Sequence, residues 1–151
     1  MLISTRSRYG LRALIQLALA EEDQPLSLSV IAEKERIPLR YLEQIFGRLR
    51  ITGLVKGRRG PGGGYLLSRP PEEIHLVEVV QCLETEFLPA SCLSDNIECG
   101  EPDEVTGRCA LEETCRTKKL WEALRCVYHT ILSENTLADL AKGNLTKVDL
   151  E

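Results

Sequence analysis

Residues 41–67 read YLEQIFGRLRITGLVKGRRGPGGGYLL, and this stretch decides the fold. Its first part repeats apolar side chains at helical spacing, which predicts the buried face of a helix. The apolar positions are Leu42, Ile45, Phe46 and Leu49. Pro38 fits the first turn of this helix because its missing N–H would be unpaired there, and Gly53 suits the cap that ends it. We therefore expect a helix from Pro38 to about Thr52.

The second part of the stretch predicts a hairpin. Leu54–Lys56 and Gly64–Leu67 read as two short strands, joined by a basic, glycine-rich loop over residues 57–63. A Walker-type phosphate loop would continue into Gly-Lys-Ser/Thr, and a dinucleotide loop would open a helix, whereas this loop leads into a strand. The pattern therefore predicts a hairpin wing and not a nucleotide site.

Two further helical patterns precede the stretch. Residues 5–20 form an amphipathic pattern, and Ser27 or Ser29 can cap a short second helix that ends near Ile37. Three helices followed by a hairpin are the parts of a winged helix-turn-helix, whose third helix enters the major groove of DNA. We expect a mainly α fold with a small β-hairpin, with residues 1–70 as the DNA-binding region.

Polar side chains of the third helix and the wing are the candidates for DNA contact. Gln can bond to adenine, Glu can accept from cytosine N4, and Arg can contact guanine or phosphate. The alternative is an ordinary solvated helix face. The candidate residues are Arg40, Glu43, Gln44, Arg48, Arg58 and Arg59.

Charge is divided unequally along the chain. Residues 1–70 carry 12 Lys/Arg and 6 Asp/Glu, a formal charge of +6, whereas residues 71–151 carry 7 and 17, a formal charge of −10. The net charge of −4 therefore hides a basic half. Because the local field attracts nucleic acid, the basic half favours double-stranded DNA as a partner.

Residues 71–151 combine an irregular segment with a long amphipathic helix. Segment 87–115 has no regular periodicity and is expected to be a cysteine-rich sensor loop. Residues 116–134 keep one apolar face for over three turns, which one small domain cannot easily cover. We expect this helix to pair with a second copy across a two-fold axis, the alternative being packing against the first helix. A homodimer of this kind implies a near-palindromic operator.

Four cysteines lie in segment 87–115. Cys92, Cys99, Cys109 and Cys115 are separated by six, nine and five residues. Uneven gaps are compatible with an iron–sulfur cluster, and no pair shows the two-residue gap of zinc knuckles. A zinc site and a thiol switch stay open as alternatives. Cys115 also lies at the start of the long helix, where the helix dipole favours a thiolate.

The remaining cysteines and both histidines are expected to be structural. Cys82 and Cys126 lie in apolar helical patterns and are expected in the core. His75 and His129 are isolated, and surface or hydrogen-bonded positions are expected for both. No nucleophile–base pairing or carboxylate pair can be read from the sequence, so we do not expect an enzyme. Without a signal peptide or membrane-spanning run, a cytoplasmic protein that does not contact the membrane is expected.

At Tyr41–Arg50, Gly53–Val55 and Arg59–Leu67 the chain closely resembles the IscR/NsrR/RirA/CymR family of bacterial winged-helix regulators, and Ser7–Gly10 agrees as well. The resemblance runs from residue 1 to about residue 140. It implies a homodimeric transcription factor, usually a repressor and sometimes an activator.

The resemblance also implies roles for individual residues. The family's groove-reading positions correspond to Glu43, Gln44 and Arg59, while Pro38 and Arg40 replace residues that are often small and polar. The operator sequence is therefore expected to differ from the familiar ones.

The same resemblance implies a cluster, with 2Fe–2S favoured over 4Fe–4S. The three cysteines of cluster-binding members correspond to Cys92, Cys109 and Cys115. Lys118 stands at the histidine ligand of IscR-like members, and the acidic ligand of NsrR-like members falls near Arg8, so Cys99 is the available fourth ligand. The expected signal is cluster status, iron, or redox or nitric oxide stress.

Overall fold

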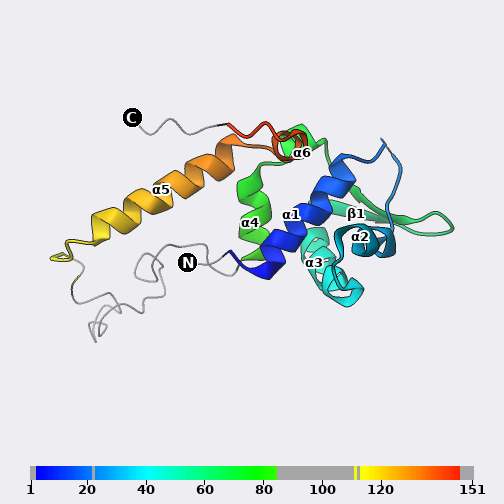
Figure 1. Ribbon diagram of the computed structural model, residues 1–151, viewed down its shortest axis with the longest axis horizontal. Helices are drawn as coiled ribbons and strands as arrows, with labels where there is room; N and C mark the ends of the chain where they lie inside the picture. Colours follow the sequence, from blue (N-terminus) through cyan, green and yellow to red (C-terminus); the bar gives the residue numbers. More distant parts are fainter. Residues whose placement is uncertain (1–2, 22, 85–110, 112, 147–151) are drawn as a thin grey trace.

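The computed structural model describes residues 3–21, 23–84, 111 and 113–146 (Figure 1). The described elements are α1 (Thr5–Ala18), α2 (Leu28–Glu35), α3 (Leu39–Ile51), β1 (Val55–Arg58), β2 (Gly64–Leu67), the 3-10 turn η1 (Pro71–Glu73), α4 (Leu76–Leu83), α5 (Lys118–Glu134) and α6 (Leu137–Lys142). These helices with one antiparallel hairpin confirm the mainly α, winged-helix fold class. None of the described helices has both the length and the apolar character needed to span a bilayer.

The first three helices begin and end close to the predicted residues. The Ser27 hydroxyl accepts from the Val30 N–H at 3.3 Å, so Ser27 and not Ser29 caps α2. Pro38 lies at the N-cap of α3, one residue outside the helix, because its ψ of 127° is extended. The prediction that Pro38 lies in the first turn is wrong by this one position. Gly53 follows α3 in the left-handed region, as predicted.

The core lies between α1, α3 and α4. Its fully buried members include Leu14, Phe46 and Val79, and α6 adds Leu137. Helices α1 and α4 pack tightly at Gly10, where a Cβ would lie 2.3 Å from Leu83 Cδ1. Helices α1 and α4 of the same chain therefore pack against the core-facing side of the recognition helix α3.

The hairpin is longer on its first strand than the sequence predicted. Val55 pairs with Leu67 and Arg58 pairs with Gly64, so Arg58 belongs to β1 and not to the loop. Strand β2 of the wing is joined to the segment before α2 by mutual backbone hydrogen bonds between Leu26 and Tyr65, at 3.0 and 2.8 Å. Only glycine fits beside this contact, because a Cβ on Gly64 would lie 2.4 Å from the Leu26 carbonyl oxygen.

The long helix α5 extends away from the other helices (Figure 1). It packs against α4, and none of its residues is buried. Leu120 is 53% exposed, and Cys126 is exposed as well. The prediction that Cys126 lies in the core is wrong for the single chain. Cys126 is exposed because α5 extends away from the helices that form the core. Cys82, by contrast, packs against the core as predicted.

Candidate DNA-binding face and cysteine site

The outward face of α3 carries polar side chains that have no partner among the described residues. Leu42, Ile45, Phe46 and Leu49 point into the core, so the intervening side chains face solvent. The exposed candidates on this helix are Arg40, Glu43, Gln44 and Arg48. Within the described residues, none of these four side chains forms a hydrogen bond or an ion pair. Their donors and acceptors are therefore available to a ligand.

The two wing arginines have different surroundings. Arg58 donates from Nη1 to the Asp23 carbonyl oxygen at 3.1 Å, which ties the wing to the turn between α1 and α2. Arg59 lies in the tip, is exposed, and has no side-chain partner in the described part of the chain. Arg58 therefore braces the wing, whereas Arg59 is the arginine that the structure leaves free.

The recognition helix and the wing are joined by aromatic packing. The rings of Phe46 in α3 and Tyr65 in β2 meet edge to face, with centroids 4.9 Å apart. The Ser68 N–H also donates to the Leu54 carbonyl oxygen at 3.1 Å, which closes the open end of the hairpin. The two candidate DNA-contacting elements therefore belong to one packed unit.

A polar network supports the turn that precedes α3. Arg12 Nε lies 2.9 Å from Glu35 Oε2, and Gln16 Nε2 donates to Glu35 Oε1 at 2.5 Å. The Arg12 guanidinium also lies over the Tyr9 ring, which meets the Tyr41 ring edge to face at 5.8 Å. This network joins α1 to the end of α2 and the start of α3. It occupies Arg12, which is therefore not one of the free cations.

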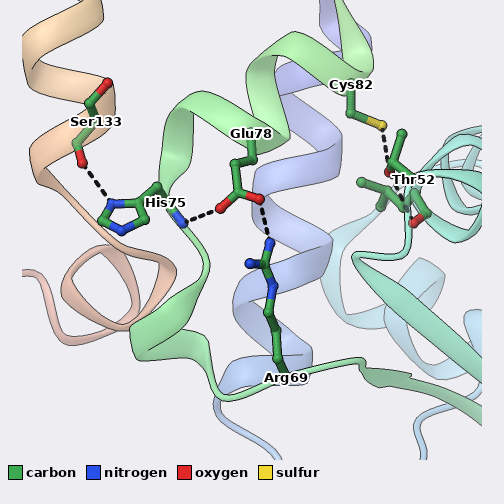
Figure 2. Close-up of polar contacts among 7 residues, drawn as sticks. Thr52, Arg69, His75, Glu78, Cys82 and Ser133 are labelled. Carbon is green, nitrogen blue, oxygen red and sulfur yellow. Dashed lines mark hydrogen bonds and ion pairs between the residues drawn. The ribbon is translucent and has the colours of Figure 1, made fainter.

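Helix α4 makes polar contacts with three other parts of the chain (Figure 2). At its start, His75 Nδ1 donates to the Ser133 carbonyl oxygen at the end of α5, at 2.6 Å. Glu78 pairs with Arg69, which follows the wing. Near its end, Cys82 Sγ lies 3.3 Å from Thr52 Oγ1, at the C-cap of α3. Helix α4 thus contacts the recognition helix, the segment after the wing and the long helix.

The Glu78 carboxylate is held in its charged form. Partial burial alone would raise its pKa, but the hydrogen bond from Arg69, the His75 backbone N–H at 3.1 Å and the Arg69 charge together lower this pKa below its ordinary value. His75 therefore has a structural role, as predicted. His129 is likewise hydrogen-bonded, to the Ser133 hydroxyl at 3.2 Å.

Of the four candidate cluster ligands, the structure describes Cys115. Cys92, Cys99 and Cys109 lie outside the described residues. Cys115 is half-buried, three residues before α5, and its Sγ lies 3.3 Å from Thr117 Oγ1. This hydrogen bond, together with the backbone N–H groups of Thr117 and Lys118, lowers the pKa of the Cys115 thiol. Among the described residues, no group of three or more His, Cys, Asp and Glu is placed to hold a metal.

Sequence reasoning missed one candidate cation. Arg50 is exposed in the last turn of α3, and no side-chain partner is present for it in the described ranges. Its place seven residues after Glu43 was a usable signal, because helical positions seven apart lie on the same side and the buried residues of α3 are on another side. We add Arg50 to the candidate face.

A three-helix unit with a basic wing and an unpaired polar recognition face defines a winged-helix DNA-binding regulator. The comparison with known families agrees. The chain belongs to the Rrf2 family, described as iron-dependent transcriptional regulators, which it matches over residues 3–143.

Individual relatives carry the same kind of name. The transcriptional regulator IscR of Cereibacter sphaeroides is 37% identical over 147 residues, covering 96% of this chain and 90% of the relative. The solved structure of CymR, the global cysteine regulator of B. subtilis, has a TM-score of 0.74 at 34% identity, covering 95% of this chain and 98% of that one. IscR of T. potens has a TM-score of 0.72 at 31% identity, with coverages of 95% and 88%. The chain is therefore a transcriptional regulator and not an enzyme.

Proposed function

We propose that the protein is a homodimeric repressor that binds a near-palindromic operator through α3 and the wing of each copy. The observation that carries this proposal is the unpaired polar face of α3, which belongs to the same packed unit as the wing that carries Arg59. A site that reads base edges needs free donors and acceptors on a rigid helix, and Glu43, Gln44 and Arg48 supply them. Arg40, Arg50 and Arg59 supply charge for phosphates.

The dimer proposal rests on α5. Its apolar side chains remain exposed or half-exposed in the single chain, among them Leu120, Trp121 and Leu124. An apolar stripe that its own chain leaves uncovered is typical of an interaction surface, and self-pairing satisfies it with one symmetric contact. Pairing of two copies through α5 would place two recognition faces on one DNA duplex.

We also propose that the cysteine segment is the sensor. Cys92, Cys109 and Cys115 would hold an iron–sulfur cluster, of the 2Fe–2S type, with Cys99 as the fourth ligand. Cys115 fits this assignment, because a thiolate is the ligating form and hydrogen bonds lower the pKa of its thiol. A bound cluster would supply one-electron redox chemistry and sensitivity to iron supply or nitric oxide.

A thiol switch is the second candidate. The lowered pKa of the Cys115 thiol favours oxidation as much as metal binding, since the thiolate is also the nucleophile. The likeness to a global cysteine regulator supports the same possibility. A zinc site formed by the same cysteines is the third candidate.

The route from sensor to DNA would run through α4. This helix contacts the end of α5 through His75 and the end of α3 through Cys82, and the cysteine segment follows it in the chain. A signal can act only insofar as the protein's two states differ in affinity for the operator. Equal operator affinity of the metal-loaded and metal-free protein would therefore remove the sensor proposal while leaving the repressor.

The DNA-binding part is tested with a random-sequence duplex by fluorescence anisotropy at low salt. We expect binding that weakens steeply as salt rises, since phosphate contacts release counterions. A winged-helix protein that binds only other proteins would leave the anisotropy of the duplex unchanged. Operators can then be enriched from a random library with the wild-type protein.

The sensor part is tested by iron, sulfide and zinc analysis of protein purified without oxygen, with a visible absorption spectrum. Alanine variants of Cys92, Cys99, Cys109 and Cys115 follow. Stoichiometric iron and sulfide, lost in these variants, would support the cluster. Zinc alone would support a structural site, and no metal would favour the thiol switch.

A further inference from the structure

A glycine lies in the middle of the outward face of α3. Gly47 follows Gln44 by three residues and precedes Ile51 by four, and Ile51 is 84% exposed. These spacings place all three positions on one side of the helix. Glycine is the least favourable residue for a helix interior apart from proline, so its presence there needs a physical reason.

The described helices contain one other interior glycine, and its reason is visible. Gly10 of α1 faces α4, where a Cβ would lie 2.3 Å from Leu83 Cδ1. Gly47 is different, because no heavy atom lies within 4 Å of the position that its Cβ would take, apart from its two chain neighbours and the nearby backbone of α3 itself. The fold of the single chain does not require glycine at position 47.

The side chains around Gly47 indicate what approaches it. Glu43 and Gln44 lie one turn before it, and Arg48 is the next residue. All three are exposed polar groups without side-chain partners among the described residues. Gly47 is therefore a gap between groups that can bind base edges and phosphates.

We propose that Gly47 is the point of closest approach between α3 and DNA in the major groove. This inference rests on the DNA-binding function proposed above. Without a side chain at position 47, the helix backbone can approach the DNA surface closely enough for Gln44 and Arg48 to reach the bases. Gly47 is thus a positioning residue, which acts by setting how deeply the helix enters the groove.

The test is a steric series at this position, comprising Gly47→Ala and Gly47→Leu in the full chain. Both changes favour the helix, so the midpoint of urea unfolding should rise. Affinity for a duplex enriched with the wild-type protein should fall about tenfold for alanine, comparable to losing one base contact, and further for leucine. A merely structural role cannot give this opposition between higher stability and weaker binding.

Gln81→Ala is the matched control, because Gln81 is an exposed helical residue of α4 outside the proposed DNA face. It should leave affinity unchanged. If both Gly47 variants bind DNA as tightly as the wild type, the inference about Gly47 is wrong and the proposed function stands. If the wild type itself binds no DNA, the proposed function fails. If Gly47→Leu lowers the molar mass in sedimentation, the gap faces a second copy of the chain and the inference is overturned.

Discussion

The winged-helix unit and the long helix α5 use their apolar residues in opposite ways. In the first, residues such as Leu14 and Phe46 are fully buried against other parts of the same chain. In α5, no residue is buried, although its apolar pattern is as regular. The two halves of the chain that contain these regions also differ in formal charge, which is +6 for residues 1–70 and −10 for residues 71–151.

This difference indicates which kind of partner the winged-helix unit and α5 each bind. Contacts within one chain complete the winged-helix unit, so that its free groups are polar and suited to DNA. Contacts within one chain leave the apolar face of α5 uncovered, so this face is suited to packing against another protein chain.

Phe46→Ala tests how far the winged-helix unit depends on its own core. Phe46 is fully buried and packs on Tyr65, so we expect a loss of about 3–5 kcal/mol in the free energy of unfolding. Urea unfolding measures it. Leu19→Ala is the control, because Leu19 is 60% exposed and its loss should cost about 0.5 kcal/mol or less. Equal losses for the two variants would contradict the assigned core.

Leu124→Glu tests the complementary claim for α5. A charge in the middle of the proposed dimer face should weaken self-association about a hundredfold, since an unpaired charge cannot be buried cheaply. The winged-helix unit should keep its helical content, measured by circular dichroism. Operator affinity should fall with the dimer, because each copy would bind its half-site alone. Lys119→Glu, at an exposed position before this face, should leave association intact.

The two regions also differed in how well they could be predicted from sequence. The helices and hairpin of residues 5–67 follow from local patterns, because apolar spacing and caps such as Ser27 act over a few residues. The exposure of Cys126 could not be predicted in this way. Apolar periodicity indicates that a face will be covered, but not whether the same chain covers it.

Long-range contacts explain the remaining differences at the candidate site. Arg58 and Arg59 look equivalent in the sequence, yet only Arg58 reaches the Asp23 carbonyl oxygen in another loop. The contacts of α4 with Ser133, Arg69 and Thr52 likewise join residues far apart in the chain. The ligand assignment stays a prediction for all four cluster cysteines, three of which lie outside the described residues.

Arg59→Ala tests the free cation of the wing. We expect about tenfold weaker operator binding and a salt dependence reduced by about one counterion, since one phosphate contact is removed. Lys142→Ala removes the same charge from α6, outside α3 and the wing, and should change neither quantity. Glu43→Ala should instead relax base preference at one operator position, which sequence selection with the variant would reveal. Unchanged binding and selectivity in both variants would contradict the proposed face.

The smallest effect concerns the Arg69–Glu78 pair beside α4. Because the pKa of Glu78 is lowered in the folded protein, the pair stabilises the fold above the ordinary pKa of 4.5 and loses this contribution as pH falls through the lowered value. Both side chains are more than a third exposed, so solvent screening limits the contribution to about 0.5 kcal/mol or less. Glu78→Gln should lower stability at pH 7 and converge with the wild type once the pH falls below the lowered pKa of Glu78. A stability difference between Glu78→Gln and the wild type that stays constant as pH falls would show that the contribution of the pair is not ionic.

The most direct test of the contrast between the two regions is the molar mass of the wild-type protein in solution, measured by sedimentation equilibrium. The account predicts twice the 16.9 kDa of one chain, with α5 as the contact, and a return to one chain in Leu124→Glu. A wild-type protein that stays at 16.9 kDa up to high micromolar concentration would contradict it, because α5 would then keep its apolar face exposed without a second copy.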